Sequence, residues 1–165
     1  SKHKPKLEKI KNQFLLERKI NENSFNKFNI RVENTKKMLN FFLSKIKKKD
    51  IIAYGASTKG NIVLNHCEIN NEHIEYICDA NPYKYNRYTP GSNLKIISKK
   101  EMRTKKPKYL LVLIWSFRKE VIKQEINFLK KGGKLIFHLP IFHIIDKKNY
   151  KKFLNSNFES LSYDL

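Results

Sequence analysis

The spacing of apolar residues divides the chain into three regions. In residues 1–50, apolar positions recur at three- and four-residue steps, first over 7–15 and then over 25–46. This spacing is typical of helices that carry one apolar stripe. It predicts a helical segment that packs on the following region, with Ser24 as the cap of its second helix.

The second region, residues 51–145, alternates short apolar runs with amphipathic stretches. The expected strands are 51–54, 74–79, 94–97, 109–114 and 134–139, and the expected helices are 58–66, 98–103 and 118–131. Strands that alternate with helices, and that are apolar throughout, indicate a parallel sheet covered on both faces. We therefore expect an α/β fold with a Rossmann-like, five-stranded, mostly parallel sheet and flanking helices. Residues 146–165 are polar with scattered aromatic residues and are expected to form a tail.

Charge changes this picture little. The 165 residues hold 35 Lys and Arg against 15 Asp and Glu, a formal net charge of +20. The excess is +10 in residues 1–50 (15 against 5) and +10 in residues 51–165 (20 against 10). An even spread indicates compositional bias with a general attraction for anions, phosphate-bearing ligands included. A concentrated basic patch would be the stronger sign of a nucleic-acid interface, so nucleic acid is an unlikely partner.

Other features narrow the function classes. The longest apolar run, residues 109–115, is too short to cross a membrane, and no leader opens the chain, so we expect a cytoplasmic protein without a membrane partner. Cys67 and Cys78 form neither a disulfide framework nor a zinc motif and are expected to be buried thiols. No histidine lies at a spacing that suggests a metal site or a nucleophile–base pair. We therefore expect no catalytic residue and no metal ligand in this chain.

The most informative stretch is YGASTKGN at residues 54–61, where the first strand leads into the first helix. Gly55 permits a tight turn, and Ser57 or Thr58 can cap the helix, whose free N–H groups would then face an anion. Gly60 permits close approach of the helix to the sheet, or of a ligand to the backbone. The stretch is neither a Walker A loop nor a G-x-G-x-x-G motif, and a capped turn without a ligand is the alternative reading.

Polar residues also follow other strand ends. Asp79 closes the second strand, where a carboxylate can accept hydrogen bonds from ribose hydroxyls or can simply cap a loop. Residues 81–82 and 90–91 are turn signals, and the loop between them holds three tyrosines and two cations that could stack on a base and bind phosphate. Alternatively, this is an ordinary solvated loop. Trp115 follows the most hydrophobic strand and is either a pocket wall or a core residue.

In their order along the chain, the motifs YGASTKGN, DANPYK, TPGSNLKI and KPKYLLVLIWSF resemble the C-terminal domain of S-adenosylmethionine-dependent sugar C-methyltransferases. These enzymes modify nucleotide-linked deoxysugars, and the resemblance covers about residues 4–145. The family combines a zinc-binding module, a middle methyltransferase domain and this Rossmann-like domain, which helps to bind the sugar nucleotide.

The resemblance implies a domain that binds a nucleoside-diphosphate sugar and positions it for methyl transfer by a separate catalytic domain. The substrate-binding residues it implies are Gly55, Ala56, Ser57, Thr58, Lys59, Gly60, Asn61, Asp79, Asn81, Pro82, Lys84, Pro90, Gly91, Trp115 and Ser116. Within this set we assign the helix N-terminus and Lys59 to the diphosphate, Asp79 to the ribose, and aromatic side chains to the base. The family pattern usually has Gly at position 86, and Asn86 can keep the turn because Asn tolerates a positive φ.

The chain shows no cysteine cluster for zinc and no glycine-rich S-adenosylmethionine loop. We therefore expect an excised domain without methyltransferase activity of its own and without a cofactor. S-adenosylmethionine and a structural zinc are expected in upstream domains, and the upstream methyltransferase domain is the expected protein partner. The alternatives are a stand-alone nucleotide- or dinucleotide-binding module, disfavoured by the missing G-x-G-x-x-G, and a basic nucleic-acid-binding domain.

Overall fold

A computed structural model describes residues 7–156 and divides the chain into two units, 1–34 and 35–165. The boundary falls within helix α2 (Glu22–Ser44), which follows helix α1 (Leu7–Glu17). No residue of α1 is buried. Of the apolar stripe predicted for α2, Leu39 belongs to the core of the second unit, whereas Phe25 and Phe28 are 61% and 56% exposed.

The second helix begins earlier than the sequence suggests. Ser24 was expected as its cap, but α2 starts at Glu22 and Ser24 lies inside its first turn. The N–H of Ser24 donates to Oδ1 of Asn21 at 3.2 Å, and the N–H of Asn21 donates back to Oγ of Ser24 at 3.3 Å. The expectation for Ser24 was wrong because two polar residues three positions apart satisfy each other, and the earlier one becomes the cap.

The second unit is built on one six-stranded sheet. Its strands are β1 (Ile51–Tyr54), β2 (Tyr76–Asp79), β3 (Lys95–Ser98), β4 (Tyr109–Val112), β5 (Lys134–Phe137) and β6 (His143–Ile145). They lie in the order β3-β2-β1-β4-β5-β6, with the first five parallel and β6 antiparallel to β5. This confirms the expected α/β fold and mostly parallel sheet, to which the structure adds the short β6.

Helices lie in three of the connections between strands and after the last strand. They are α3 (Thr58–His66), α4 (Lys99–Thr104), α5 (Arg118–Gln124), α6 (Ile126–Lys130) and, after β6, α7 (Tyr150–Asn155). The single helix expected over 118–131 is therefore wrong, because it is interrupted at Glu125. The carboxylate of that residue is buried and accepts a hydrogen bond from the Tyr54 hydroxyl at 2.9 Å. Helix α7 lies in the region expected to be a tail, and residues 157–165 lie outside the described part of the chain.

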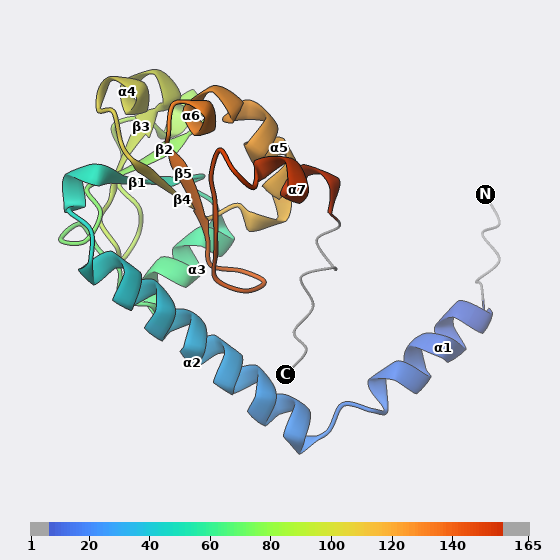
Figure 1. The fold of residues 1–165 in the computed structure, drawn as a ribbon. Coiled ribbons are helices and arrows are strands. Elements are labelled where there is room, and N and C mark those ends of the chain that lie inside the picture. The colour runs from blue at the N-terminus through green and yellow to red at the C-terminus, as the bar shows by residue number, and fades with distance from the viewer. Residues whose placement is uncertain (1–6, 157–165) are drawn as a thin grey trace. The chain divides into compact units, whose positions relative to one another are not determined.

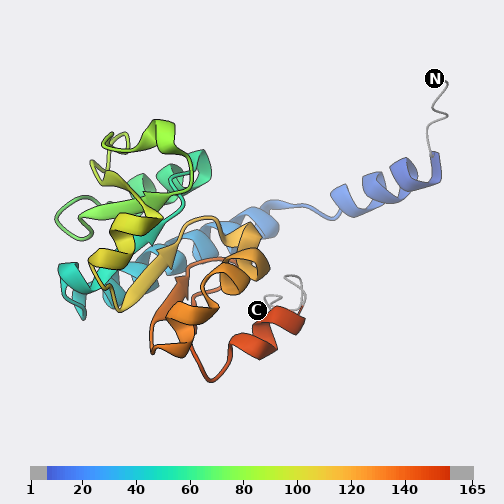
Figure 2. The ribbon, with the colours of Figure 1, turned by 90° about the horizontal axis from the view of Figure 1, so that it is seen from above.

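The two faces of the sheet carry separate cores. Ile51 and Ala53 of β1 belong to the cluster that contains Leu64 of α3. Ile52 and Tyr54, which point to the opposite face, belong to the cluster that contains residues of α4, α5 and α6. Figure 1 shows α3 on one side of the sheet and α4, α5 and α6 on the other. In Figure 2, α4 (olive) and the α5–α6 segment (orange) lie next to each other on their shared face.

Gly60 sets how closely α3 approaches the sheet. A Cβ added at this position would lie 2.8 Å from Cβ of Leu113, just beyond β4. Cβ of Leu113 is fixed to the backbone and cannot rotate away. Of the two roles that the sequence left open for Gly60, the structure therefore shows the close packing of helix on sheet.

We expect Gly60→Ala to lower the free energy of unfolding by about 1–2 kcal/mol, because overpacking outweighs the better helix propensity of alanine. Urea denaturation measures the change. Lys59→Ala, at the neighbouring exposed position, is the control and should stay within about 0.5 kcal/mol of wild type. Equal stability of Gly60→Ala and wild type would show that the helix can shift to make room.

Candidate functional site

The loops that follow β1, β2 and β4 meet at the carboxyl edge of the sheet. Strand β1 pairs with β2 on one side and with β4 on the other. The connections therefore leave this point in opposite directions, β2 and β3 to one side, β4 and β5 to the other. Open parallel sheets bind ligands in the crevice at such a switch point.

Gly55 turns the chain immediately after β1. Its φ is +91°, a conformation that other residues rarely adopt, and a Cβ there would lie 2.6 Å from Cγ2 of Ile114. Its N–H donates to the carbonyl of Cys78 at 2.8 Å, which extends the pairing of β1 with β2 into the loop. The predicted tight turn at Gly55 is confirmed.

Helix α3 begins directly after this turn, and its cap is Ser57. Oγ of Ser57 accepts a hydrogen bond from the N–H of Gly60 at 3.0 Å, which decides between Ser57 and Thr58 as the cap. Within residues 7–156, the N–H groups of Thr58 and Lys59 donate to no acceptor. The exposed ammonium group of Lys59 likewise makes no hydrogen bond or ion pair with the described residues. The first turn of α3 thus presents two open donors and one cation.

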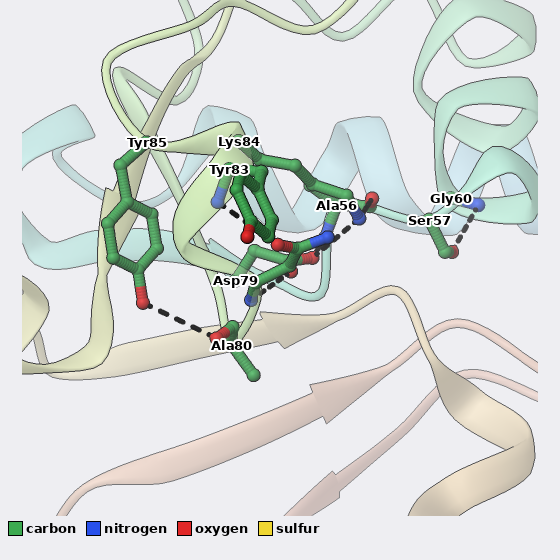
Figure 3. A network of polar contacts seen from close by, with 9 residues as sticks. Ala56, Ser57, Gly60, Asp79, Ala80, Tyr83, Lys84 and Tyr85 are labelled. Carbon is green, nitrogen blue, oxygen red and sulfur yellow. Dashed lines mark hydrogen bonds and ion pairs between the residues drawn. The ribbon is translucent and has the colours of Figure 1, made fainter.

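Asp79, at the end of β2, is held by groups of the protein itself (Figure 3). Its Oδ2 accepts from the N–H of Ala56 at 2.8 Å and lies 3.3 Å from Nζ of Lys84. Its Oδ1 accepts from the N–H of Asn81 at 2.8 Å. Nζ of Lys84 also donates to the carbonyl of Ala56 at 2.8 Å, so the three residues close a ring of contacts.

The residues after Asp79 form a short turn that aims Lys84 at the loop. Oδ1 of Asn81 accepts from the N–H of Tyr83 at 3.0 Å, and Pro82 begins a 3₁₀ turn over Pro82–Lys84. Asn86 follows with φ at +61°, the positive φ that the sequence analysis expected of it. Asn81 and Pro82 thus shape the loop, and Lys84 is the residue that reaches back to Ala56.

A hollow of about 290 Å³ opens beside Gly55 and Asp79, on the face of the sheet covered by α4 and α5. Its lining residues are Tyr54, Gly55, Cys78, Asp79, Ala80, Lys99, Ile114, Phe117, Glu120, Val121 and Gln124. No sequence signal marked Lys99 or Gln124, which come from α4 and α5. Phe117 carried a signal, since it ends the W-S-F stretch after the most hydrophobic strand.

Other predicted site residues lie elsewhere. Pro90 accepts a hydrogen bond from Asn65 at 3.1 Å, and a Cβ on Gly91 would overlap the Asn65 side chain, so this turn packs against α3. Trp115 is half-buried, and its ring packs edge-on to that of His138 with the two ring centroids 4.9 Å apart. Ser116 is exposed. None of these four predicted residues lines the hollow.

The remaining predicted residues, Ala56 and Asn61, stay close to α3. Ala56 is buried in the loop, where Asp79 and Lys84 hold its N–H and carbonyl. Oδ1 of Asn61 is buried and has no hydrogen-bond partner among the described residues.

Buried polar groups under the hollow are held in protonated forms. Burial, reinforced by the charge of Glu125, raises the pKa of the Cys78 thiol to about 12. Burial and the adjacent Glu125 also raise the pKa of Tyr54 well above its usual range. Glu125 is in turn paired with Arg103. At neutral pH these groups carry neither thiolate nor phenolate and are not nucleophiles.

A larger hollow, about 670 Å³, lies at the opposite, amino edge of the sheet. Four cations line it: Arg103, Lys106, Lys108 and Lys131. Arg103 forms an ion pair with Glu125, and Nζ of Lys108 lies 3.2 Å from Oδ2 of Asp50. Helices α4 and α6 end there, and cations at helix C-termini offset the partial negative charge of the last carbonyls. This surface is explained without a ligand.

Residues 7–156 show neither a metal site nor a membrane-spanning helix. No group of three or more His, Cys, Asp or Glu side chains comes together in a way that could hold a metal ion. No helix in this part of the chain combines the length and the apolar character that a membrane crossing requires.

Comparison with known proteins adds independent findings. Residues 1–140 match the model of a family described as the C-methyltransferase C-terminal domain. The C-methyltransferase NovU of Streptomyces niveus is 32% identical over 101 residues, which are 61% of this chain and 24% of NovU. The chain thus spans about a quarter of the length of this curated relative.

His138, just beyond β5, is fully buried. Burial and then the nearby His143 lower its pKa from 6.5 to about 4. The folded chain therefore holds His138 neutral, while the unfolded chain would protonate it below about pH 6.5. The contribution of His138 to the free energy of unfolding is therefore complete above about pH 6.5 and is lost as the pH falls toward 4.

We expect the wild-type chain to lose up to about 3 kcal/mol of unfolding free energy from this source between pH 7 and pH 4. His138→Phe should lose clearly less over the same interval, because the titrating group is gone. Urea denaturation at several pH values measures both, with the exposed His66→Gln as a control that keeps the wild-type slope. An unchanged slope in His138→Phe would assign the acid sensitivity to other groups.

Proposed function

The chain belongs to the family of C-methyltransferase C-terminal domains, and from this we propose that it binds a nucleoside-diphosphate sugar at the carboxyl edge of its sheet. In this proposal it holds the sugar for methylation by a separate catalytic domain. The match over residues 1–140 confirms the resemblance inferred from the order of the motifs.

One observation carries the proposal: the first turn of α3 has open N–H groups at Thr58 and Lys59. The partial positive charge of a helix N-terminus and its unpaired donors favour a phosphate group. The unpaired ammonium of Lys59 adds a full positive charge at the same turn. A diphosphate is therefore the ligand group that best suits this end of the helix.

The adjacent hollow can take the flat or ring-shaped part of such a ligand. At about 290 Å³ it suits one base or one sugar ring rather than a complete nucleotide sugar. Ile114 and the 57% exposed Phe117 provide apolar contact, and Gln124 provides an amide. Because Gly55 belongs both to the hollow and to the turn before α3, a ligand in the hollow can extend to the helix.

A domain that only binds the substrate can still contribute to the rate of methyl transfer. A methyl transfer gains from any contact that fixes the acceptor carbon relative to the methyl donor, even when that contact lies far from the reacting atoms. We assign binding of the nucleotide to this domain. S-adenosylmethionine, a structural zinc and the catalytic groups are assigned to other domains of the enzyme. A cytoplasmic location fits a nucleotide-sugar substrate.

The 165-residue chain should bind at least one of the diphosphates of uridine, thymidine, guanosine, cytidine and adenosine, and should bind it more tightly than S-adenosylmethionine. Lys59→Ala should weaken this binding about tenfold, the value expected for loss of a charge-assisted hydrogen bond. Isothermal titration calorimetry at fixed ionic strength measures both affinities.

Lys37→Ala, which removes the same charge from an exposed position on α2, is the matched control and should bind like wild type. Equal weakening by the two variants would indicate a general charge effect instead of a site. Failure of the wild-type chain to bind any of the five diphosphates would contradict the proposal.

A further inference from the structure

We infer that Asp79 and Lys84 act as positioning residues, which hold the loop before α3 in a phosphate-binding shape and do not themselves contact the pentose or the phosphates. The inference rests on the proposed function, and it replaces the direct contact between Asp79 and ribose that the sequence suggests. We call the three joined residues Ala56, Asp79 and Lys84 the loop clamp.

Groups of the protein already use most of the hydrogen-bonding capacity of the Asp79 carboxylate. Its side chain is 13% exposed, and both oxygens accept hydrogen bonds from backbone N–H groups at 2.8 Å, one from Ala56 and one from Asn81. Nζ of Lys84 approaches Oδ2 as well, at 3.3 Å. The protein's own donors thus fill three of the roughly four acceptor positions of the carboxylate, and the mostly buried side chain offers a ribose hydroxyl little access to the fourth.

Both backbone polar groups of Ala56 are held by side chains from the end of β2 and the loop after it. Its N–H donates to Asp79, and its carbonyl accepts from Lys84 at 2.8 Å. Figure 3 shows both contacts converging on this one residue from the same loop. Ala56 stands between Gly55, the most flexible kind of residue, and Ser57, the cap of α3. Holding Ala56 therefore sets the direction of the first N–H groups of the helix.

The charge of Lys84 also matters for a phosphate-bearing ligand. An isolated carboxylate beside the start of α3 would repel a diphosphate. The ammonium group of Lys84, 3.3 Å from Oδ2, offsets that charge where the ligand would approach. The pair thus fixes the loop without cancelling the attraction of the helix terminus for anions.

The two roles of Asp79 predict opposite results for a ligand that lacks a pentose. If Asp79 contacts ribose, then its removal leaves the affinity for inorganic pyrophosphate unchanged, or raises it because a negative charge is lost. If Asp79 holds the loop, then its removal lowers the affinity for pyrophosphate and for a nucleoside diphosphate alike.

The experiment uses the 165-residue chain and titrates it with pyrophosphate and with the tightest-binding nucleoside diphosphate. We expect Asp79→Ala and Lys84→Met each to weaken both ligands about tenfold, by factors that agree within about twofold. Asp79→Asn, which keeps an oxygen acceptor, should recover part of the affinity of Asp79→Ala for both. Lys100→Met, at an exposed position on α4, should bind as wild type does. Thermal denaturation checks that every variant is folded.

Amide hydrogen exchange without ligand gives a second readout that does not depend on binding. The N–H of Ala56 should be protected in the wild-type chain and should exchange at least tenfold faster in Asp79→Ala, with core amides of β4 unchanged. Loss of affinity for the nucleoside diphosphate alone, unchanged affinity for both ligands, or unchanged exchange at Ala56 would each overturn the inference. A wild-type chain that binds neither ligand but shows the exchange result would contradict the proposed function and leave the clamp standing as a structural element only.

Discussion

The carboxyl edge of this sheet depends on how one peptide segment is held, the turn from Gly55 to Ser57. The segment must reverse direction within three residues, and Gly55 makes this possible with a φ of +91°. Flexibility of that kind needs an opposing constraint, and the β2 loop supplies it through Asp79 and Lys84. The start of α3 is therefore set by a strand that follows it in sequence, so that helix direction and sheet pairing are coupled.

Much of this arrangement can be predicted from the sequence. The limits of β1 and α3 agree with the expected ranges, because a continuous apolar run and a capped helix leave local signals at both ends. The break at Glu125 and the strand β6 could not be predicted. The first depends on contacts of a buried carboxylate with Tyr54 and Arg103, far away in sequence, and the second has only three residues and no periodicity.

The candidate site, like the fold, could be predicted only where local backbone geometry decides the role of a residue. Gly55, Ser57 and Gly60 could be assigned roles because each role follows from local backbone geometry. The partners of Asp79 could not, since a carboxylate at a strand end has the same sequence signature whether it faces a ligand or its own loop. Trp115 is a similar case: its position allowed either a pocket wall or a core residue, and its ring packs on His138 beside β5.

In the proposed function, the open turn of α3 receives the phosphates. The most direct measurement is a nitrogen-15 NMR titration of the chain with the nucleoside diphosphate that binds most tightly. The largest amide shifts are expected at Thr58 and Lys59. Largest shifts around the cation-lined hollow at the amino edge, near Lys106 and Lys131, with none at the start of α3, would contradict the proposed function.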